Sequence, residues 1–305
     1  MATAAATDGH QNKGLDFTGL CITQLVNVLF ALNVIASKVI VTATAPFLAV
    51  TLRMGMVFLI CAPAFRLVPG RNRTLAFYGL LNGGLFLLLM NLALSMASNV
   101  AALAIAGQLS VPFSLLLGAL LLGERLSPRK IFGVLLAFAG VAVLVFDRHV
   151  VDDLVAVLVM ASAALAWGGG TLLQRKLGGI PVLTIQAWNG LMGAALLLPF
   201  TLLLEPGKTA TLAHVGWVPV AWFAFSVLGS TVLGQGAMAW LLQRYPISTV
   251  MPLTLASPVI STACAALYFG TPVTPVMILG GSLALVGVTV IALAKDARMP
   301  PIEVP

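Results

Sequence analysis

Charged residues are scarce in this chain: Asp, Glu, Lys and Arg together make up 8% of its 305 residues, while 60% are apolar. A soluble domain carries about a quarter charged residues, so this composition excludes a protein whose surface is mostly covered by water. The apolar runs reach about 20 residues, which is enough to cross a bilayer as a helix. They do not alternate apolar and polar residues as membrane β-strands do. The predicted fold class is therefore an all-α membrane protein.

Ionisable groups that could carry catalysis or proton coupling are also missing from these runs. All nine acidic residues and all three histidines fall in predicted loops or tails. The three cysteines lie inside apolar runs, where they predict neither a disulfide framework nor a metal site. The hydrolase signatures HExxH and GxSxG do not occur. We therefore expect no catalytic residue, no metal, no organic cofactor and no titrating carboxylate at mid-membrane.

About ten apolar runs fit into the chain, each long enough to span a bilayer. Every connecting loop is short and leaves no room for a soluble domain. The predicted spans are 17–36, 46–65, 74–94, 99–122, 130–146, 154–174, 180–204, 217–241, 247–269 and 273–294.

The net charge of +7 comes from basic residues scattered singly among the loops, so no basic face is available for nucleic acid. Twelve of them fall in one set of alternate loops and the two ends, and three in the other set. Because cytoplasmic loops carry the excess of Lys and Arg, we predict a multi-pass protein of the inner membrane with both termini in the cytoplasm.

An internal repeat divides the chain. Residues 107–146 resemble residues 254–293 at an offset of 147. The matched pairs are Ser110 with Ser257, Gly123 with Gly270, Pro128 with Pro275, Gly133 with Gly280 and Gly140 with Gly287. One period holds five spans, an odd number, so the second half is predicted to be inverted in the membrane. Its loop GTPVTPVM has no basic residue where the first copy, GERLSPRK, has three.

This repeat sets the predicted domain organisation. It consists of a disordered tail at 1–14, a first five-helix repeat at 15–148, an inverted second repeat at 149–298 and a tail at 299–305. Inverted repeats of this kind are typical of secondary transporters, whose halves rock about a site near the midplane.

Three short motifs carry a resemblance to a known family. They are G-E-R-L-S-P at 123–128 before a G-x6-G span at 133–140, P-x6-R at 46–53, and the pair Trp167-Gly168. In this order the chain resembles the EamA-type branch of the drug/metabolite transporter superfamily, and within it the YddG-type exporters of amino acids. The resemblance implies ten helices and export of amino acids, including aromatic ones. The chain departs from the family at Thr271, where a glutamate is common.

Aromatic and amide side chains inside the spans are the candidate binding residues. Tyr78, Asn82 and Phe86 recur every four residues and share one helix face. They either line a cavity or bond to a neighbouring helix. Trp167 lies deeper than an interface tryptophan and suits an aromatic or amphipathic ligand. Two neutral hydrogen-bonding candidates lie beside prolines, namely Gln108 and Ser257.

Other polar residues of the spans favour packing. Gln186 and Asn189 share a face with glycines, as in a helix contact. Trp188 and Trp240 lie closer to span ends and are interpreted as interface anchors.

Two prolines and two cations complete the candidate set. Pro112 and Pro258 occupy nearly corresponding positions of the two halves and predict helix kinks, at the binding site or merely tolerated in packing. Arg53, and Lys38 at the outer end of the first span, are possible anion partners. The alternative for Arg53 is hydrogen bonding to carbonyls at helix ends.

These features predict a secondary transporter, an exporter or exchanger, that works by alternating access around a central cavity. We expect a small neutral or zwitterionic ligand, because the candidate lining has rings and amides but no carboxylate. The resemblance narrows the ligand to amino acids and related amphipathic compounds. The expected partners are this small molecule and membrane lipid, with no nucleic acid, and the protein is expected to be a monomer. The alternatives are an integral membrane enzyme, which would need clustered His, Asp, Glu or Ser–Lys groups, and a channel.

Overall fold

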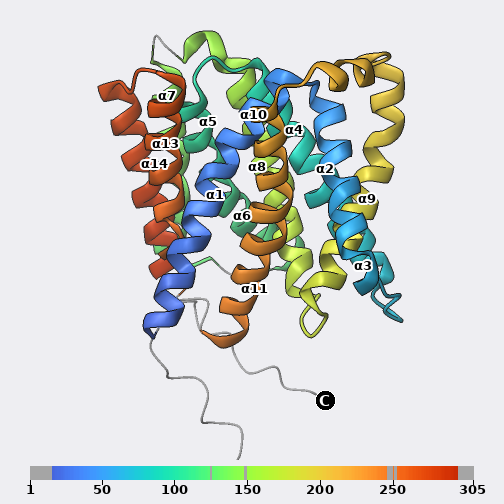
Figure 1. Cartoon of the computed structure of the whole chain (residues 1–305). Helices are drawn as coiled ribbons and strands as arrows, with labels where there is room; N and C mark the ends of the chain where they lie inside the picture. The colour runs from blue at the N-terminus through green and yellow to red at the C-terminus, as the bar shows by residue number, and fades with distance from the viewer. Residues whose placement is uncertain (1–15, 124–125, 148–149, 246–249, 251–252, 295–305) are drawn as a thin grey trace, which may run out of the picture.

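The structure is a computed structural model that describes residues 16–123, 126–147, 150–245, 250 and 253–294. All elements within these residues are helical, and the long helices run side by side as a bundle (Figure 1). Nine of them are long and apolar enough to cross a membrane. The chain is thus a helical protein with multiple candidate spans, as predicted. The ninth predicted span, 247–269, is described as the shorter helix α13 (Ala256–Phe269), while 246–249 and 251–252 lie outside the described residues.

The helices of the first half follow the predicted spans closely. Their bounds are α1 (Phe17–Ala43), α2 (Pro46–Cys61), α3 (Asn72–Tyr78), η2 (Gly79–Phe86), α4 (Leu87–Met96), α5 (Val100–Ala106), η3 (Gly107–Leu109), α6 (Ser110–Leu122) and α7 (Pro128–Val145).

The second half repeats this order. Its elements are η4 (Val151–Asp153), α8 (Leu154–Arg175), α9 (Val182–Leu204), α10 (Trp217–Ala224), η6 (Phe225–Gly234), α11 (Gln235–Arg244), α13 and α14 (Pro275–Leu293). The motif residues Glu124 and Arg125 lie outside the described residues.

Local sequence signals begin the last helix of each half in the same way. Ser127 and Thr274 are the N-caps of α7 and α14, and each side-chain oxygen accepts a hydrogen bond from the backbone amide three residues later. A proline follows each cap at the first helical position, where its missing amide costs nothing. These caps are related by the offset of 147 seen in the sequence.

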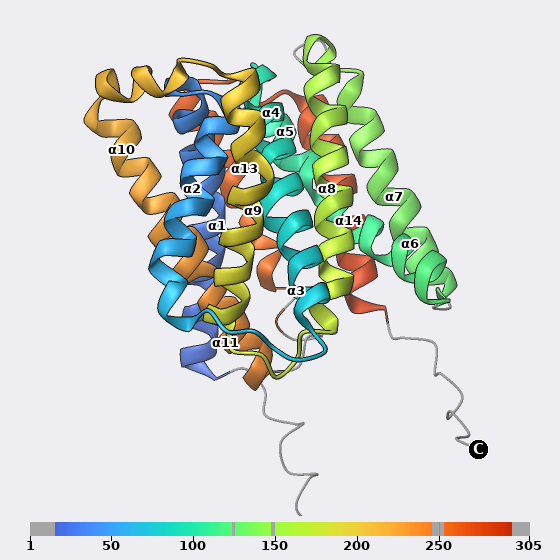
Figure 2. The same ribbon diagram turned by 90° about the vertical axis from the view of Figure 1, so that its right-hand side faces the viewer.

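The helix α1 starts, and the helix α14 ends, at the same end of the bundle, the lower end in both Figure 1 and Figure 2. We call this the terminal end and the opposite one the far end. Which of the two faces the cytoplasm stays a prediction.

The helices α7 and α14 form the most extensive helix pair of the described structure, at one side of the bundle (Figure 2). At their crossing Gly133 meets Gly287, and Gly140 meets Gly280, so closely that an added Cβ would collide with the opposing backbone. All four glycines belong to residue pairs that the sequence repeat matches. Glycine is required here because its missing side chain allows the two backbones to approach.

The other helix contacts also occur in related pairs. The helix α2 packs along α9, and this pair is the second most extensive one. The helix α1 packs on α13 and η6, while its counterpart α8 packs on α6 and η2. Exchanging each of these helices with its counterpart in the other half therefore reproduces these main contacts.

Carboxylates join helices at the far end. Glu205, after α9, accepts hydrogen bonds from the amides of Phe47 and Leu48 at the start of α2, at 3.1 and 2.8 Å. Asp153 accepts from the amides of Ser98 and Asn99 before α5, at 3.0 and 2.7 Å. Each carboxylate thus caps the positive end of another helix.

A third acidic contact lies at this end, where the Thr274 hydroxyl donates to Asp147. Asp152 and Asp153 lie in η4, the first turn of the candidate span Val151–Gln174, and not in a loop as the sequence had indicated. The difference is one helical turn, because η4 begins the span and both carboxylates remain at the far end of the bundle.

Candidate functional site

Three of the predicted binding residues meet between η2 and α8. Asn82 is buried and lies directly over Gly170, where any Cβ would strike the Asn82 amide. One turn further along η2, the ring of Phe86 contacts the ring of Trp167, with centroids 4.7 Å apart and a tilt of 54°. The structure therefore brings Asn82, Phe86 and Trp167 together. Their role in substrate binding stays a prediction.

The segments η2 and η6 are π-helical, a feature that the sequence analysis missed. At the repeat offset of 147, Gly79 corresponds to Ser226 and Phe86 to Leu233, so the two π-helices occupy matching places. In η6 the Thr231 hydroxyl donates to the carbonyl of Ser226, five residues earlier, at 2.9 Å. Because π-helical turns are frequent at functional sites, the two segments are candidates for the walls of a binding site. No sequence pattern singles out these two segments.

Tyr78 lies on the terminal side of this group, with its side chain next to Asn82. Its side chain is buried in an apolar cluster with Leu75, Leu177, Ile180 and Trp188, nearer to the terminal end. In the same cluster the indole nitrogen of Trp188 donates to the carbonyl of Arg66 at 3.0 Å. The interpretation of Trp188 as an anchor in the membrane interface is wrong, because its ring is buried between helices.

The two prolines begin helices after an interruption. Pro112 is the third residue of α6 and follows the 3-10 segment η3, which contains Gln108. Pro258 is the third residue of α13, which begins at Ala256 and has Ser257 as its second residue. Both prolines are buried. The Gln108 amide donates to the carbonyl of Ala104 at 3.5 Å, and Ser257 is half-buried.

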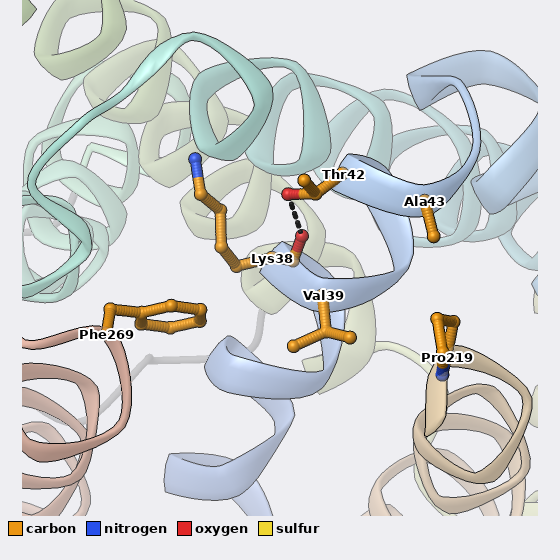
Figure 3. Close-up of a pocket in the computed structure, with 6 residues that line it drawn as sticks. All are labelled: Lys38, Val39, Thr42, Ala43, Pro219 and Phe269. Carbon is orange, nitrogen blue, oxygen red and sulfur yellow. Dashed lines mark hydrogen bonds between the residues drawn. The ribbon is translucent and has the colours of Figure 1, made fainter. Parts of the chain in front are cut away.

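The two candidate cations have different surroundings. Lys38 lies beside a shallow depression of about 390 Å³, lined also by Val39, Thr42, Ala43, Pro219 and Phe269. Its ammonium turns away from the other lining residues (Figure 3) and donates to the carbonyls of Leu94 and Ala97, at 2.7 and 2.6 Å. These carbonyls lie at the end of α4. Hydrogen bonding to helix-end carbonyls, which the sequence suggested as the alternative for Arg53, is thus what the structure shows for Lys38.

Arg53 makes no such contact. Its side chain is buried, and its Nη2 donates to the hydroxyl of Thr231 in η6, at 2.9 Å. A second shallow depression, of about 320 Å³, is lined by apolar and aromatic residues such as Trp222 and Tyr268. Neither depression contains Arg53, Asn82 or Trp167. The predicted central cavity therefore stays a prediction.

Amide side chains form a further polar group between α9 and α11. The Gln186 amide donates to the Gln235 side-chain oxygen at 2.6 Å, and the Asn189 amide donates to Gln186 at 3.4 Å. The sequence analysis had interpreted Gln186 and Asn189 as a packing stripe. Their hydrogen bonds do join two helices, and the neighbouring Gly190 packs against the backbone of α2.

Comparisons with known proteins relate the whole chain to membrane transporters. The sequence model of the EamA-like transporter family matches residues 17–146 and again residues 154–293. A "probable amino-acid metabolite efflux pump" of Salmonella typhimurium is 27% identical over 280 residues, covering 86% of this chain and 91% of that protein. The protein of the same name from Escherichia coli is 26% identical over the same lengths.

Two further comparisons are less informative about function. An uncharacterised protein of Pseudomonas aeruginosa, PA1977, is 32% identical over 169 residues, covering 54% of this chain and 55% of that protein. A solved crystal structure shares the fold, with a TM-score of 0.61 and 22% identity, covering 90% of this chain and 95% of the other. The resemblance to EamA-type drug/metabolite transporters and to exporters of amino acids is confirmed by the family match and the named relatives. The chain belongs to the EamA-like transporter family, and it is a multi-pass membrane transporter and not an enzyme.

Proposed function

We propose that this protein exports or exchanges small amphipathic metabolites, amino acids with aromatic side chains among them, by alternating access between its two halves. The observation that carries the proposal is the exchange pattern of the helix contacts. Several contacts between the two halves have a counterpart in which the halves trade places, such as α1 with η6 and α8 with η2. Such pseudo-symmetry allows a transporter to reach two states in which the halves exchange conformations, by rocking one half against the other.

The antiparallel pair of α7 and α14 supports an inverted arrangement of the halves. Gly133 faces Gly287 and Gly140 faces Gly280, although the repeat matches Gly133 with Gly280 and Gly140 with Gly287. This crossed pairing is expected when a two-fold axis lies in the membrane plane between the two helices. A two-fold axis along the membrane normal would leave the two helices parallel.

The substrate class follows from the relatives and from the group between η2 and α8. Both relatives that match 86% of this chain are named as probable amino-acid metabolite efflux pumps. The contact of Phe86 with Trp167 provides aromatic faces beside the buried amide of Asn82. Rings and a neutral amide suit a partly apolar ligand without net charge.

The driving force is proposed to be the ligand gradient alone. Among the described residues of the spans, the acidic groups lie at the ends, where Asp153 and Glu205 cap helices. A proton-coupled carrier needs a titrating group deep in the bundle. Ligand binding then favours the closed intermediate enough to permit the exchange between states.

Exchange of labelled phenylalanine in liposomes that contain the purified protein tests this function. We expect saturable uptake that is accelerated by unlabelled phenylalanine inside the vesicles, with protein-free liposomes as the control. Flux that grows linearly with concentration and shows no acceleration would instead identify a channel. An imposed pH gradient should not drive phenylalanine above its equilibrium distribution. Uphill accumulation after a pH jump would contradict the ligand-driven mechanism.

A further inference from the structure

Arg53 is a buried cation whose charge has no counterion in the described part of the chain. Arg53 lies in the middle of the span formed by α2, and only 5% of its surface is exposed. Its one hydrogen bond is the contact of Nη2 with the Thr231 hydroxyl at 2.9 Å, and its Nε has no partner. A guanidinium group offers five N–H donors in a planar fork. Most of this hydrogen-bonding capacity is therefore unused.

A guanidinium in this situation is energetically incomplete. Arginine stays charged in proteins, so it cannot escape the cost of burial by losing a proton. Burial of an unpaired charge costs several kcal/mol, even after relaxation of the surroundings. The Thr231 hydroxyl compensates little of this cost, because it is neutral and its own proton is given to the Ser226 carbonyl. Lys38 shows how the chain satisfies a structural cation, with two backbone carbonyls at 2.6 and 2.7 Å.

The place of Arg53 in the bundle connects the two halves. Its helix, α2, belongs to the first half, and its partner Thr231 lies in the π-helix η6 of the second half. The next residue, Met54, packs against Gly190 and Gly193 of α9. A ligand that binds the guanidinium would thus contact both halves at a segment whose π-helical turns are typical of functional sites.

We propose that Arg53 binds the carboxylate of the transported substrate, so that this carrier selects carboxylates over the corresponding amines and amides. A carboxylate fits the guanidinium fork with two parallel hydrogen bonds, and it supplies the missing counterion. This inference rests on the proposed function and extends it to a specific substrate group. The Asn82 and Trp167 group then contacts the apolar part of the ligand.

Competition between phenylalanine and its neutral carboxamide tests the proposal in liposomes. We expect phenylalanine to compete with labelled phenylalanine at least ten times better than phenylalaninamide does in the wild-type protein, at a pH above the pKa of the amide's amino group, where that compound is uncharged. In the variant Arg53→Gln, competition by phenylalanine should become weaker while competition by the amide stays unchanged, so that the preference is lost. Arg53→Lys keeps the charge without the fork and should retain part of the preference.

Thr231→Val is the matched structural control, because it removes the one hydrogen bond of Arg53 and keeps the charge. We expect it to preserve the ratio between acid and amide. If Arg53 only holds η6 in place, Arg53→Gln will weaken competition by both compounds equally, and the proposal is overturned. If an Arg53 variant does not fold, the wild-type series decides, since equal competition by the amide also overturns the proposal. Absence of saturable phenylalanine exchange by the wild type would instead count against the proposed function, and the inference would fall with it.

Discussion

Individual side chains at the terminal end tie the first span to the end of α11. The Asp16 carboxylate accepts hydrogen bonds from the Gly19 amide at 2.7 Å and from the Tyr245 hydroxyl at 2.6 Å. The Tyr245 hydroxyl, followed by the Gly19 amide, holds the pKa of Asp16 below its ordinary value. The same hydrogen bond to Asp16 raises the pKa of Tyr245. The contact therefore requires an ionised Asp16 and a protonated Tyr245.

This contact predicts a contribution to stability that stays constant between an acidic and an alkaline limit of pH. Because the pKa of Asp16 is depressed, its contribution is complete above about pH 4 and is lost as pH falls through the folded-state pKa. The pKa of Tyr245 is raised, so its contribution is complete below about pH 10 and is lost as pH rises further. We expect Tyr245→Phe, which keeps the ring against Gly19, to lower the melting temperature in detergent slightly and by the same amount from pH 5 to 9. A step in this difference near neutral pH would contradict the assignment.

The ring contact between Phe86 and Trp167 predicts the effect of a substitution at the candidate binding group. In the proposed site Trp167 also contacts the ring of the ligand, and loss of such an aromatic contact costs about 0.5–1.5 kcal/mol beyond the buried area. We therefore expect Trp167→Leu to raise the KM for phenylalanine roughly three- to ten-fold, with an unchanged amount of folded protein in the membrane. Trp217→Leu is the control, since Trp217 is 80% exposed on the outer surface. An equal effect of both substitutions would remove Trp167 from the binding site.

Whole helices depend on one another at the far end. The N-cap of α2 is Ala45, which has no side-chain oxygen. Glu205, directly after α9, supplies the missing acceptor to the amide of Phe47, 158 residues earlier in the chain. A carboxylate at this position also interacts favourably with the positive end of the helix dipole. The helices α2 and α9 are thus joined both by packing along their length and by a charged cap at one end.

Removal of this cap should destabilise the α2–α9 pair. Loss of a helix cap costs roughly 0.5–2 kcal/mol, so we expect Glu205→Ala to lower the melting temperature measurably. Ala45→Ser should restore part of the loss in the double variant, because serine caps its own helix. Asp152→Asn is the control, an exposed acidic side chain at the same end. If the second substitution does not help, Glu205 stabilises the protein by another route than capping.

The element scale also shows where sequence reading succeeds. The apolar runs predicted the starts of α7 and α14 within two residues, and the caps Ser127-Pro128 and Thr274-Pro275 fix these starts in the structure. The sequence analysis missed η2 and η6, because π-helical turns depend on what the helix packs against and have no sequence pattern of their own. It also placed Trp188 at the membrane interface, since hydropathy cannot distinguish a lipid-facing ring from one buried against a neighbouring helix.

On the scale of the whole molecule, the orientation of the two halves in the membrane can be tested directly. Arg129 near the start of α7 and Val273 before α14 lie at opposite ends of the bundle and at exposed positions. In a background without the three native cysteines, we expect Val273→Cys to react with an impermeant thiol reagent in intact cells. Arg129→Cys should react only after permeabilisation, because its loop is predicted to be cytoplasmic.

Two other results of this labelling are informative. The reverse pattern would keep the inverted repeat and contradict the positive-inside orientation. Labelling of both cysteines from one side would contradict the inverted repeat itself, and with it the exchange of the two halves that alternating access requires.

The sequence by itself determined the membrane class, the approximate spans and the family. The physical reason is that a spanning helix satisfies its own backbone hydrogen bonds within one segment, so its signal is local. The repeat was visible for the same reason, since Gly133 and Gly140 recur with their neighbours at a fixed offset.

Only the tertiary structure decided which polar residue meets which partner. Lys38 and Arg53 were equivalent candidates in the sequence, yet Lys38 is satisfied by carbonyls of α4 and Arg53 has a single hydroxyl from η6. The sequence likewise grouped Tyr78 with Asn82, and the structure adds Trp188 of α9 as a neighbour of Tyr78. Contacts of this kind join residues far apart in the chain, and they depend on how the helices are arranged around one another, which local periodicity does not encode.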